Sequence, residues 1–359
     1  MRNKAVLICL LITALLAAAY VTFWAEEFSK EEAPDSPVIE VQDPSPNASV
    51  TVTREPDAET EKKENEDRYP WEQPVVPIAG FSGEQPTIVC WGDSLTESID
   101  GKAYPDFLRK LTQTEVVNYG VRAETARAIA IREGAVPIFV GACVISENAV
   151  PVPVEVTSAD GSGIQLLKNG SAGVNPCYIG GIAGTLSYDG PEGRYYFTRA
   201  KKGEAVRIEA GSRLTTDGMA SRRKGDVLII FSGTNDGPDA SSIYDIIEVQ
   251  RAMLDYADCK KYVIIGLTCK KVMPEIEEVN KILAKEYGEH FLDIRSYLLS
   301  YGLAEAGLTP TAQDRADLKN GEIPSSLRKD YVHGNIYFYE ILAGQVYRKL
   351  EYLGYIPNN

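Results

Sequence analysis

Short apolar runs alternate with helical segments along much of this chain. Continuous runs rich in Val, Ile and Leu occupy 87–91, 115–120, 226–233 and 261–267, and a shorter one occupies 290–294. Runs of this kind are typical of strands buried on both faces. Apolar positions at helical spacing occupy the segments 102–111, 123–134, 241–257, 273–288 and 335–354. This alternation predicts an α/β fold, in which a central parallel sheet carries helices on both faces as a three-layer α/β/α sandwich.

Residues 136–224 interrupt this pattern. They show no helical period, and short β-type runs separated by Gly, Asp and Ser occupy 150–158, 164–170, 178–190, 194–203 and 205–218. Turn signals at intervals of roughly 8–12 residues are typical of small all-β units, and the stretch is too long for an unstructured loop. We therefore expect an inserted β-rich domain at 136–224, within a main domain formed by 86–135 and 225–359. The insert is a carbohydrate-binding lobe, a wall of the active site, or a structural unit without a ligand.

The N-terminal region differs from the rest. Arg2 and Lys4 precede a stretch from Ala5 to Trp24 that carries no charge, which is long enough to span a bilayer as a helix. Residues 1–24 are thus predicted to be a membrane anchor with the body outside, or a cleaved signal segment. Residues 25–85 are rich in Glu, Asp, Pro and Ser without an apolar period, which indicates an extended acidic linker.

Composition narrows the function classes. The formal net charge is −14, and nucleic-acid recognition needs clustered Lys and Arg, so no nucleic-acid partner is expected. Of the six cysteines, only Cys143 and Cys177 are considered as a disulfide pair. The sequence has no CxxC, HExxH or His cluster, so neither a metal nor another cofactor is expected.

Ser94 stands at the end of the first predicted strand, in "GDSL" at 92–95. The chain has two histidines, and His290 enters a predicted strand, where burial is its ordinary fate. His333 lies in a polar loop before the last helix, three residues after Asp330. A serine nucleophile, a histidine base and an aspartate that orients the base are the groups that acyl transfer needs.

Three donors for an oxyanion follow consecutive strands. They are the backbone N–H groups of Ser94 and Gly120 and the side-chain amide of Asn235 in "GTND" at 233–236. Each has an ordinary structural explanation when taken alone, since Gly120 suits a turn and Asn235 suits a helix cap. Because the carboxyl ends of parallel strands meet at one rim, their joint placement favours an oxyanion hole.

These motifs together resemble the SGNH/GDSL hydrolases. "GDSL" at 92–95, Gly120 in "NYG", "GTND" and "DYVH" at 330–333 follow the order of the four signature blocks of that family. The resemblance covers roughly 86–133 and 225–356 and implies a flavodoxin-like fold that acts on esters. It implies that Ser94 is the nucleophile, His333 the base and Asp330 its orienting acid. It further implies that Ser94, Gly120 and Asn235 form the oxyanion hole and that Asp93 has a supporting role.

The substrate is less constrained than the chemistry. An anchor or signal segment and an acidic linker place the protein at the cell surface, or outside the cell if the segment is cleaved. Family members with β inserts include acetylesterases, so we expect removal of acetyl groups from an envelope or extracellular polysaccharide such as peptidoglycan. A lipase- or thioesterase-like hydrolase and a glycan-binding surface protein that uses the insert are the alternatives. The segment 307–330 is expected to form a lid or a wall of the cleft, and the sequence sets no oligomeric state.

Overall fold

The computed structural model describes residues 86–97, 102–159, 164–222, 226–237 and 241–356. The predicted anchor or signal segment at 1–24 and the linker at 25–85 lie outside these residues. Within the described part of the chain, no helix has the length and apolar character needed to cross a membrane.

A five-stranded sheet forms the centre of the main domain. Its strand order is β14-β13-β12-β1-β2, and every neighbouring pair is parallel. This is the 2-1-3-4-5 order of flavodoxin-like folds, which confirms the predicted fold class. The bounds are β1 Ile88–Gly92, β2 Val116–Gly120, β12 Val227–Phe231, β13 Tyr262–Ile265 and β14 Phe291–Leu292.

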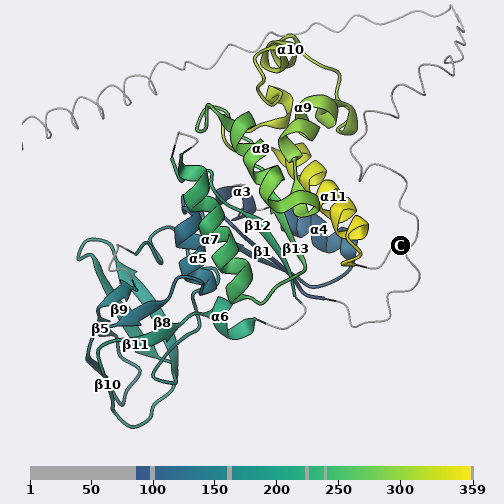
Figure 1. Ribbon diagram of the computed structural model, residues 1–359. Coiled ribbons are helices and arrows are strands. Elements are labelled where there is room, and N and C mark those ends of the chain that lie inside the picture. Colours follow the sequence, from purple (N-terminus) through teal and green to yellow (C-terminus); the bar gives the residue numbers. More distant parts are fainter. Residues whose placement is uncertain (1–85, 98–101, 160–163, 223–225, 238–240, 357–359) are drawn as a thin grey trace, which may run out of the picture. The chain divides into compact units, whose positions relative to one another are not determined.

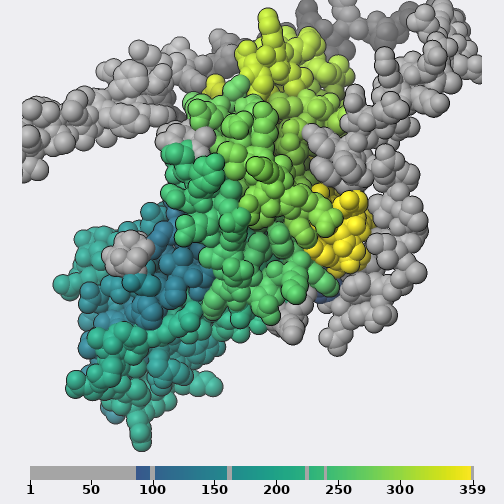
Figure 2. Space-filling model, viewed as in Figure 1, coloured from purple at the N-terminus to yellow at the C-terminus, as the bar shows by residue number. Residues whose placement is uncertain are grey.

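Successive residues of each strand point to opposite faces of the sheet, and each face has its own apolar core. Val89 and Trp91 pack on one face against α5 (Ala126–Glu133), α7 (Ser242–Tyr256) and α8 (Ile276–Tyr287). Ile88 and Cys90 pack on the other face against the helices α4 (Tyr104–Thr112), α9 (Ile294–Glu305) and α11 (Ile336–Tyr352). Figure 1 shows the strands between α7 and α8 on one side and α4 and α11 on the other, and α7 and α8 are surface helices in Figure 2.

The insert is built from antiparallel strands around a separate apolar core that includes Leu186, Phe197 and Leu214. Seven strands form a sheet of order β5-β9-β8-β7-β11-β3-β6, and β10 pairs with β4. The bounds are β3 Ile138–Val140, β4 Cys143–Ile145, β5 Val152–Val154, β6 Val156–Ser158, β7 Cys177–Ile179, β8 Ile182–Asp189, β9 Arg194–Arg199, β10 Val206–Ile208 and β11 Ser212–Thr215, followed by the short helix α6 Asp217–Ser221.

One predicted β run of the insert is wrong. Residues 164–170 form turns rather than a strand. Ile164 and Leu166 are buried in the core of the insert, and their carbonyl oxygens accept hydrogen bonds from the Tyr195 hydroxyl. The apolar residues of this run therefore anchor a turn.

The cysteine pairing considered from the sequence is also not found. Cys143 and Cys177 are both free, as are the other three cysteines of the described chain. Cys177 is buried on β7 among the apolar residues of the insert. It therefore fills the core as a small apolar side chain.

The segment 307–330 contains a helix that the sequence analysis did not specify. Helix α10 spans Ala312–Lys319, and Asp314 and Asp317 both face the turn that follows it. Asp314 accepts hydrogen bonds from the N–H and hydroxyl of Ser326 at 2.9 and 2.8 Å. Asp317 accepts the N–H of Ser325 at 2.8 Å and pairs with Arg328 at 3.2 Å. The segment thus holds the chain that leads to Asp330 and His333.

A four-residue helix, α3 (Ser94–Glu97), follows β1 and packs directly on the end of β2. A Cβ atom on Gly120 would lie 2.1 Å from the backbone nitrogen of Glu97, and one on Gly92 would lie 2.0 Å from Thr96 Oγ1. Neither position has room for a side chain, because the α3 backbone covers Gly120, while the Thr96 side chain and the Phe231 carbonyl oxygen of β12 cover Gly92.

This contact makes Gly120 sensitive to the smallest substitution. We expect Gly120→Ala to lower the free energy of unfolding by about 1–3 kcal/mol, because the added methyl group overlaps backbone atoms. Urea denaturation measures this change. Gly190→Ala is the control, since a Cβ there meets no atom within 4 Å, and it should change stability by less than about 0.5 kcal/mol. Equal stability of the two variants would contradict the close packing of α3.

Candidate active site

Ser94 is placed by the turn that joins β1 to α3. Asp93 begins this turn: its Oδ1 accepts the N–H of Leu95 at 2.9 Å, and its carbonyl oxygen accepts the N–H groups of Thr96 and Glu97 at 3.1 and 2.9 Å. These bonds satisfy the N–H groups of the second, third and fourth residues of the helix. Ser94 is the first residue of α3 and is 7% exposed, so its hydroxyl lies at the carboxyl-end rim of the sheet.

Asp330 and His333 share a tight loop between α10 and α11. The loop is closed by an antiparallel bridge between Arg328 and Gly334, and the N–H of Lys329 donates to the carbonyl oxygen of His333 at 2.9 Å. Asn335 ends the loop as the N-cap of α11, accepting the N–H of Tyr337 at 3.1 Å. The loop therefore has a fixed backbone on both sides of the histidine.

The structure brings the three predicted catalytic side chains together. His333 Nε2 lies 2.9 Å from Ser94 Oγ, and His333 Nδ1 lies 2.8 Å from Asp330 Oδ2. One imidazole nitrogen therefore faces the serine while the other is held by the carboxylate. This is the hydrogen-bond arrangement in which a serine loses its proton to a histidine.

Asp330 is held as a carboxylate by its neighbours. It accepts the backbone N–H groups of Val332 and His333, both at 2.7 Å, in addition to the imidazole. Partial burial acts in the opposite direction, but the hydrogen bonds from His333 and Val332 hold the pKa of Asp330 below its ordinary value. A charged Asp330 keeps the Nδ1 proton in place and stabilises the imidazolium when it forms.

The predicted oxyanion donors are only partly available. The side chain of Asn235 is exposed, and one of its two amide N–H groups donates to the carbonyl oxygen of Glu124 at 2.9 Å. That bond fixes the amide and leaves its second N–H for a ligand. The N–H of Gly120 instead donates to Asn118 Oδ1 at 2.9 Å. Gly120 therefore serves the close packing of α3 in this structure, and its N–H is not free to bind an oxyanion.

The structure singles out Ala123 in the turn after β2, which sequence reasoning missed. Its φ is 57°, in the left-handed region that side chains other than glycine rarely adopt. The next residue, Glu124, accepts the Asn235 amide. No hydrogen-bond partner is found for the Ala123 N–H among the described residues. A glycine at this position would have indicated the turn from the sequence, but an alanine gives no such indication.

Two further carboxylates of the signature segments have structural contacts. Asp236 accepts the N–H of Ala126 at 2.8 Å, so it ties the loop after β12 to the first turn of α5. Burial raises the pKa of Asp236 to about 6 and that of Asp93 to about 7. Asp93 is fully buried, and its Oδ2 has no hydrogen-bond partner. The supporting role of Asp93 stays a prediction.

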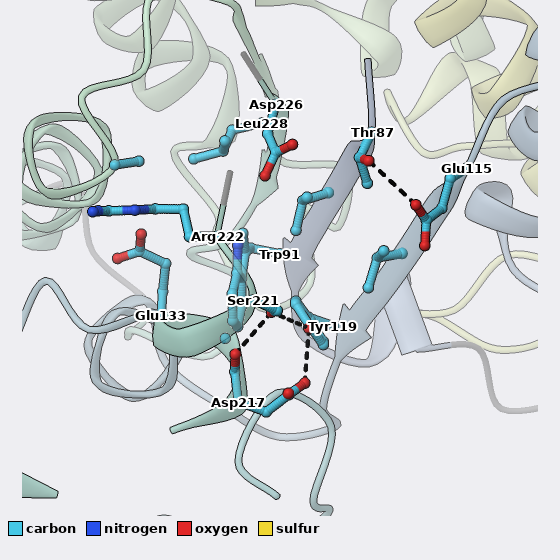
Figure 3. Close-up of a pocket in the computed structure, with 14 residues that line it drawn as sticks. Thr87, Trp91, Glu115, Tyr119, Glu133, Asp217, Ser221, Arg222, Asp226 and Leu228 are labelled. Carbon is cyan, nitrogen blue, oxygen red and sulfur yellow. Dashed lines mark hydrogen bonds between the residues drawn. The ribbon is translucent and has the colours of Figure 1, made fainter. Parts of the chain in front are cut away.

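Two cavities lie near these elements. One of about 310 Å³ is lined by Asp330 together with Gln313, Asp317 and Tyr331. Another, of about 360 Å³, runs along β1 and β2 from Thr87 and Glu115 to Trp91 and Tyr119, and none of the predicted catalytic residues lines it. Figure 3 shows Tyr119 in this second cavity, where its hydroxyl donates to Asp217 at 3.0 Å. Among the described residues, no group of three or more His, Cys, Asp or Glu is arranged to hold a metal ion.

The buried carboxyl of Asp93 predicts a pH-dependent stability. Between pH values of about 4 and 7, the unfolded chain has lost the Asp93 proton while the folded protein still holds it, so the contribution of Asp93 to stability falls as pH rises. The substitution Asp93→Asn removes the ionisable group and with it this dependence. We therefore expect the melting temperature of Asp93→Asn, relative to that of the wild type, to increase as the pH is raised from about 5 to about 8.

Exposed Asp255→Asn is the control for this measurement by differential scanning calorimetry, and it should leave the pH profile unchanged. A constant or shrinking difference between Asp93→Asn and the wild type over this pH range would contradict the burial of an ionisable Asp93.

Comparisons with known proteins find similarity only among solved structures. No protein-family model matches the sequence, and no curated protein matches it. Among solved structures, a G-D-S-L family protein from Desulfitobacterium hafniense is 16% identical with a TM-score of 0.39, and the match covers 74% of this chain and all of that chain. The SGNH-hydrolase family esterase AlinE4 is 15% identical with a TM-score of 0.31, and covers 75% of this chain and 96% of its own. A peptidoglycan O-acetylesterase is 14% identical with a TM-score of 0.33, over 76% of this chain and 92% of that one. At these identities and TM-scores, the matches do not assign a function to this chain.

Proposed function

We propose that this protein is an SGNH-type serine esterase that works outside the cytoplasm and removes acetyl groups from a cell-envelope or extracellular polysaccharide. The observation that carries the esterase proposal is the continuous chain of hydrogen bonds from Ser94 Oγ through His333 to Asp330, with distances of 2.9 and 2.8 Å. A serine hydroxyl without such a base is a weak nucleophile at neutral pH.

The reaction proceeds in two acyl transfers. Ser94 Oγ attacks the carbonyl carbon of the ester while His333 Nε2 takes its proton, and Asp330 stabilises the resulting imidazolium. The tetrahedral intermediate then collapses, the sugar oxygen leaves with the proton from His333, and an acetyl-serine remains. Water attacks this ester with His333 again as base, which releases acetate and restores the serine.

The negative charge of the tetrahedral oxygen needs donors that are already in place. The free amide N–H of Asn235 and the backbone N–H of Ser94 serve this purpose, and we assign the third position to the Ala123 N–H in place of Gly120. This choice follows from the bond between Gly120 and Asn118 and from the turn that brings Ala123 next to Glu124, the partner of Asn235. A single donor of this kind contributes roughly 3 kcal/mol to transition-state stabilisation.

The substrate and the location rest on the sequence. The uncharged stretch from Ala5 to Trp24 and the acidic linker that follows favour a protein anchored to the membrane or secreted. Acetylated glycans are abundant substrates in that setting, and the N-terminal segment would keep the enzyme beside them. The contacts of Ser94 with an intact histidine–aspartate pair disfavour the alternative of a glycan-binding protein with a vestigial site.

Acetate release from a panel of O-acetylated envelope polysaccharides, including peptidoglycan, tests this proposal. The full panel adds long-chain acyl esters and an acyl thioester, and Ser94→Ala is the matched control. We expect the wild type to release acetate from at least one glycan and Ser94→Ala to release none, because no other group takes the place of the nucleophile.

Three outcomes would contradict the proposal in different ways. Undiminished turnover by Ser94→Ala would rule out the serine mechanism. A preference for long-chain esters or thioesters would rule out the acetylesterase assignment. Binding of a glycan by the full-length wild type without any ester turnover would favour a surface-attachment protein.

A further inference from the structure

A fully buried arginine lies behind the candidate active site. Arg132 on α5 has no exposed side-chain surface, and its Nε donates to Glu124 Oε2 at 2.7 Å, where Glu124 is itself 1% exposed. A buried pair of charges is costly to place, because both ions lose their hydration. Such a pair is stable when further hydrogen bonds compensate for the lost hydration. The other hydrogen-bond partners of this guanidinium therefore indicate which parts of the structure it stabilises.

Two of these partners are the strand ends that form the active-site rim. Arg132 Nη1 donates to the carbonyl oxygen of Tyr119 at 2.9 Å, and Nη2 donates to that of Gly92 at 3.3 Å. Gly92 is the last residue of β1, two positions before Ser94, and the Gly92 carbonyl also accepts the N–H of Val121 at 3.0 Å. One rigid, planar group therefore ties the ends of β1 and β2 together directly beneath the nucleophile.

The same arginine also holds the turn that carries Ala123 and binds Asn235. Its ionic partner Glu124 follows Ala123, and the carbonyl oxygen of Glu124 accepts the amide of Asn235. The side chain of Glu124 is thus fixed by Arg132 while its backbone fixes Asn235. Movement of Glu124 would displace both the left-handed turn at Ala123 and the amide.

The remaining contacts of Arg132 lead into the β-rich insert. The second N–H of Nη1 donates to the carbonyl oxygen of Ala172 at 2.9 Å, and the carbonyl oxygen of Arg132 accepts the hydroxyl of Thr216 at 2.7 Å. The guanidinium also lies over the Trp91 ring, with 5.3 Å between its carbon and the ring centroid. A Cβ on Gly218 would lie 2.5 Å from that ring, so the insert packs closely against the other side of the same network.

We propose that Arg132 is a positioning residue that couples the insert to the active site: it holds the ends of β1 and β2 and the Glu124 turn in the geometry that catalysis requires. The insert then contributes to catalysis as part of the frame of the site, whether or not it binds a glycan. This inference rests on the proposed esterase function.

Arg132→Lys tests the inference because it keeps the charge and removes the planar group that bonds four partners at once. We expect kcat for a short-chain ester to fall roughly 10²-fold, as small displacements of catalytic groups do, while KM changes little. The number of reactive sites is counted by titration of Ser94 with a fluorophosphonate, so that kcat refers to folded enzyme only. Asn235→Ala provides the reference for loss of one donor.

Arg199→Lys is the matched control. Arg199 is a buried arginine of the insert, and its Nη1 donates to the carbonyl oxygens of Ser146 and Glu204, both at 2.8 Å. It has no contact with the active site, so its substitution should lower the melting temperature while leaving kcat per titrated site unchanged. A purely structural Arg132 would behave in the same way as Arg199.

A second variant approaches the network from the insert. Gly218→Ala presses a methyl group on the Trp91 ring, and it changes no predicted catalytic residue. We expect it to lower kcat per titrated site. This variant also tests the inference if Arg132→Lys does not fold. The inference would be overturned if folded Arg132→Lys, or folded Gly218→Ala where Arg132→Lys does not fold, kept a kcat within a factor of about two of wild type. The proposed function would still stand in that case, since it fails only if the wild type shows no turnover dependent on Ser94.

Discussion

Helix α3 lies directly on the carboxyl ends of β1 and β2, and the position of Ser94 depends on this contact. The backbone of Glu97 approaches Gly120 so closely that a single added carbon would overlap it. Asp93 accepts the N–H groups of the three helical residues that follow Ser94, although its own carboxyl group is buried and has one oxygen without a partner. The serine hydroxyl therefore reaches the rim of the sheet through a turn that requires a close backbone contact and a buried carboxyl group.

The histidine reaches this serine from a distant part of the chain. Ser94 and His333 are separated by 239 positions, and the loop that carries His333 has its own supports. Asp314 and Asp317 of α10 bind the turn at Ser325 and Ser326, and Asn335 caps the following helix. A second network is centred on Arg132, which ties the two strand ends to the Glu124 turn and to the insert. Two networks that do not share a residue thus support the site.

Much of the main domain could be predicted from the sequence because its signals are local. Apolar runs rich in Val, Ile and Leu indicated four of the parallel strands and a shorter apolar run the fifth, and helical spacing indicated α4, α5, α7, α8 and α11. The triad residues were found because only two histidines exist and one of them follows an aspartate in a loop. In contrast, residues 164–170 have the composition of a strand, yet they form a turn in which Ile164 and Leu166 accept hydrogen bonds from the distant Tyr195 hydroxyl.

The rest of the site depends on contacts between distant residues. Gly120 occupies the expected position in the motif, but only the structure shows that its N–H is taken by Asn118 and that its missing side chain makes room for α3. Ala123 adopts a glycine-like conformation without being a glycine. Arg132 has no motif of its own, because its partners come from β1, β2, the Glu124 turn and the insert. Local pattern cannot reveal a residue whose role is to join separate segments.

The central claim is that the fold makes Ser94 a nucleophile by placing its hydroxyl against His333. Its most direct test is the reaction of the intact protein with a fluorophosphonate, followed by mass measurement and mapping of the modified peptide. The account predicts a single adduct on Ser94, formed much more slowly in His333→Ala because the base is lost. No adduct, an adduct on another residue, or an unchanged rate in His333→Ala would contradict it.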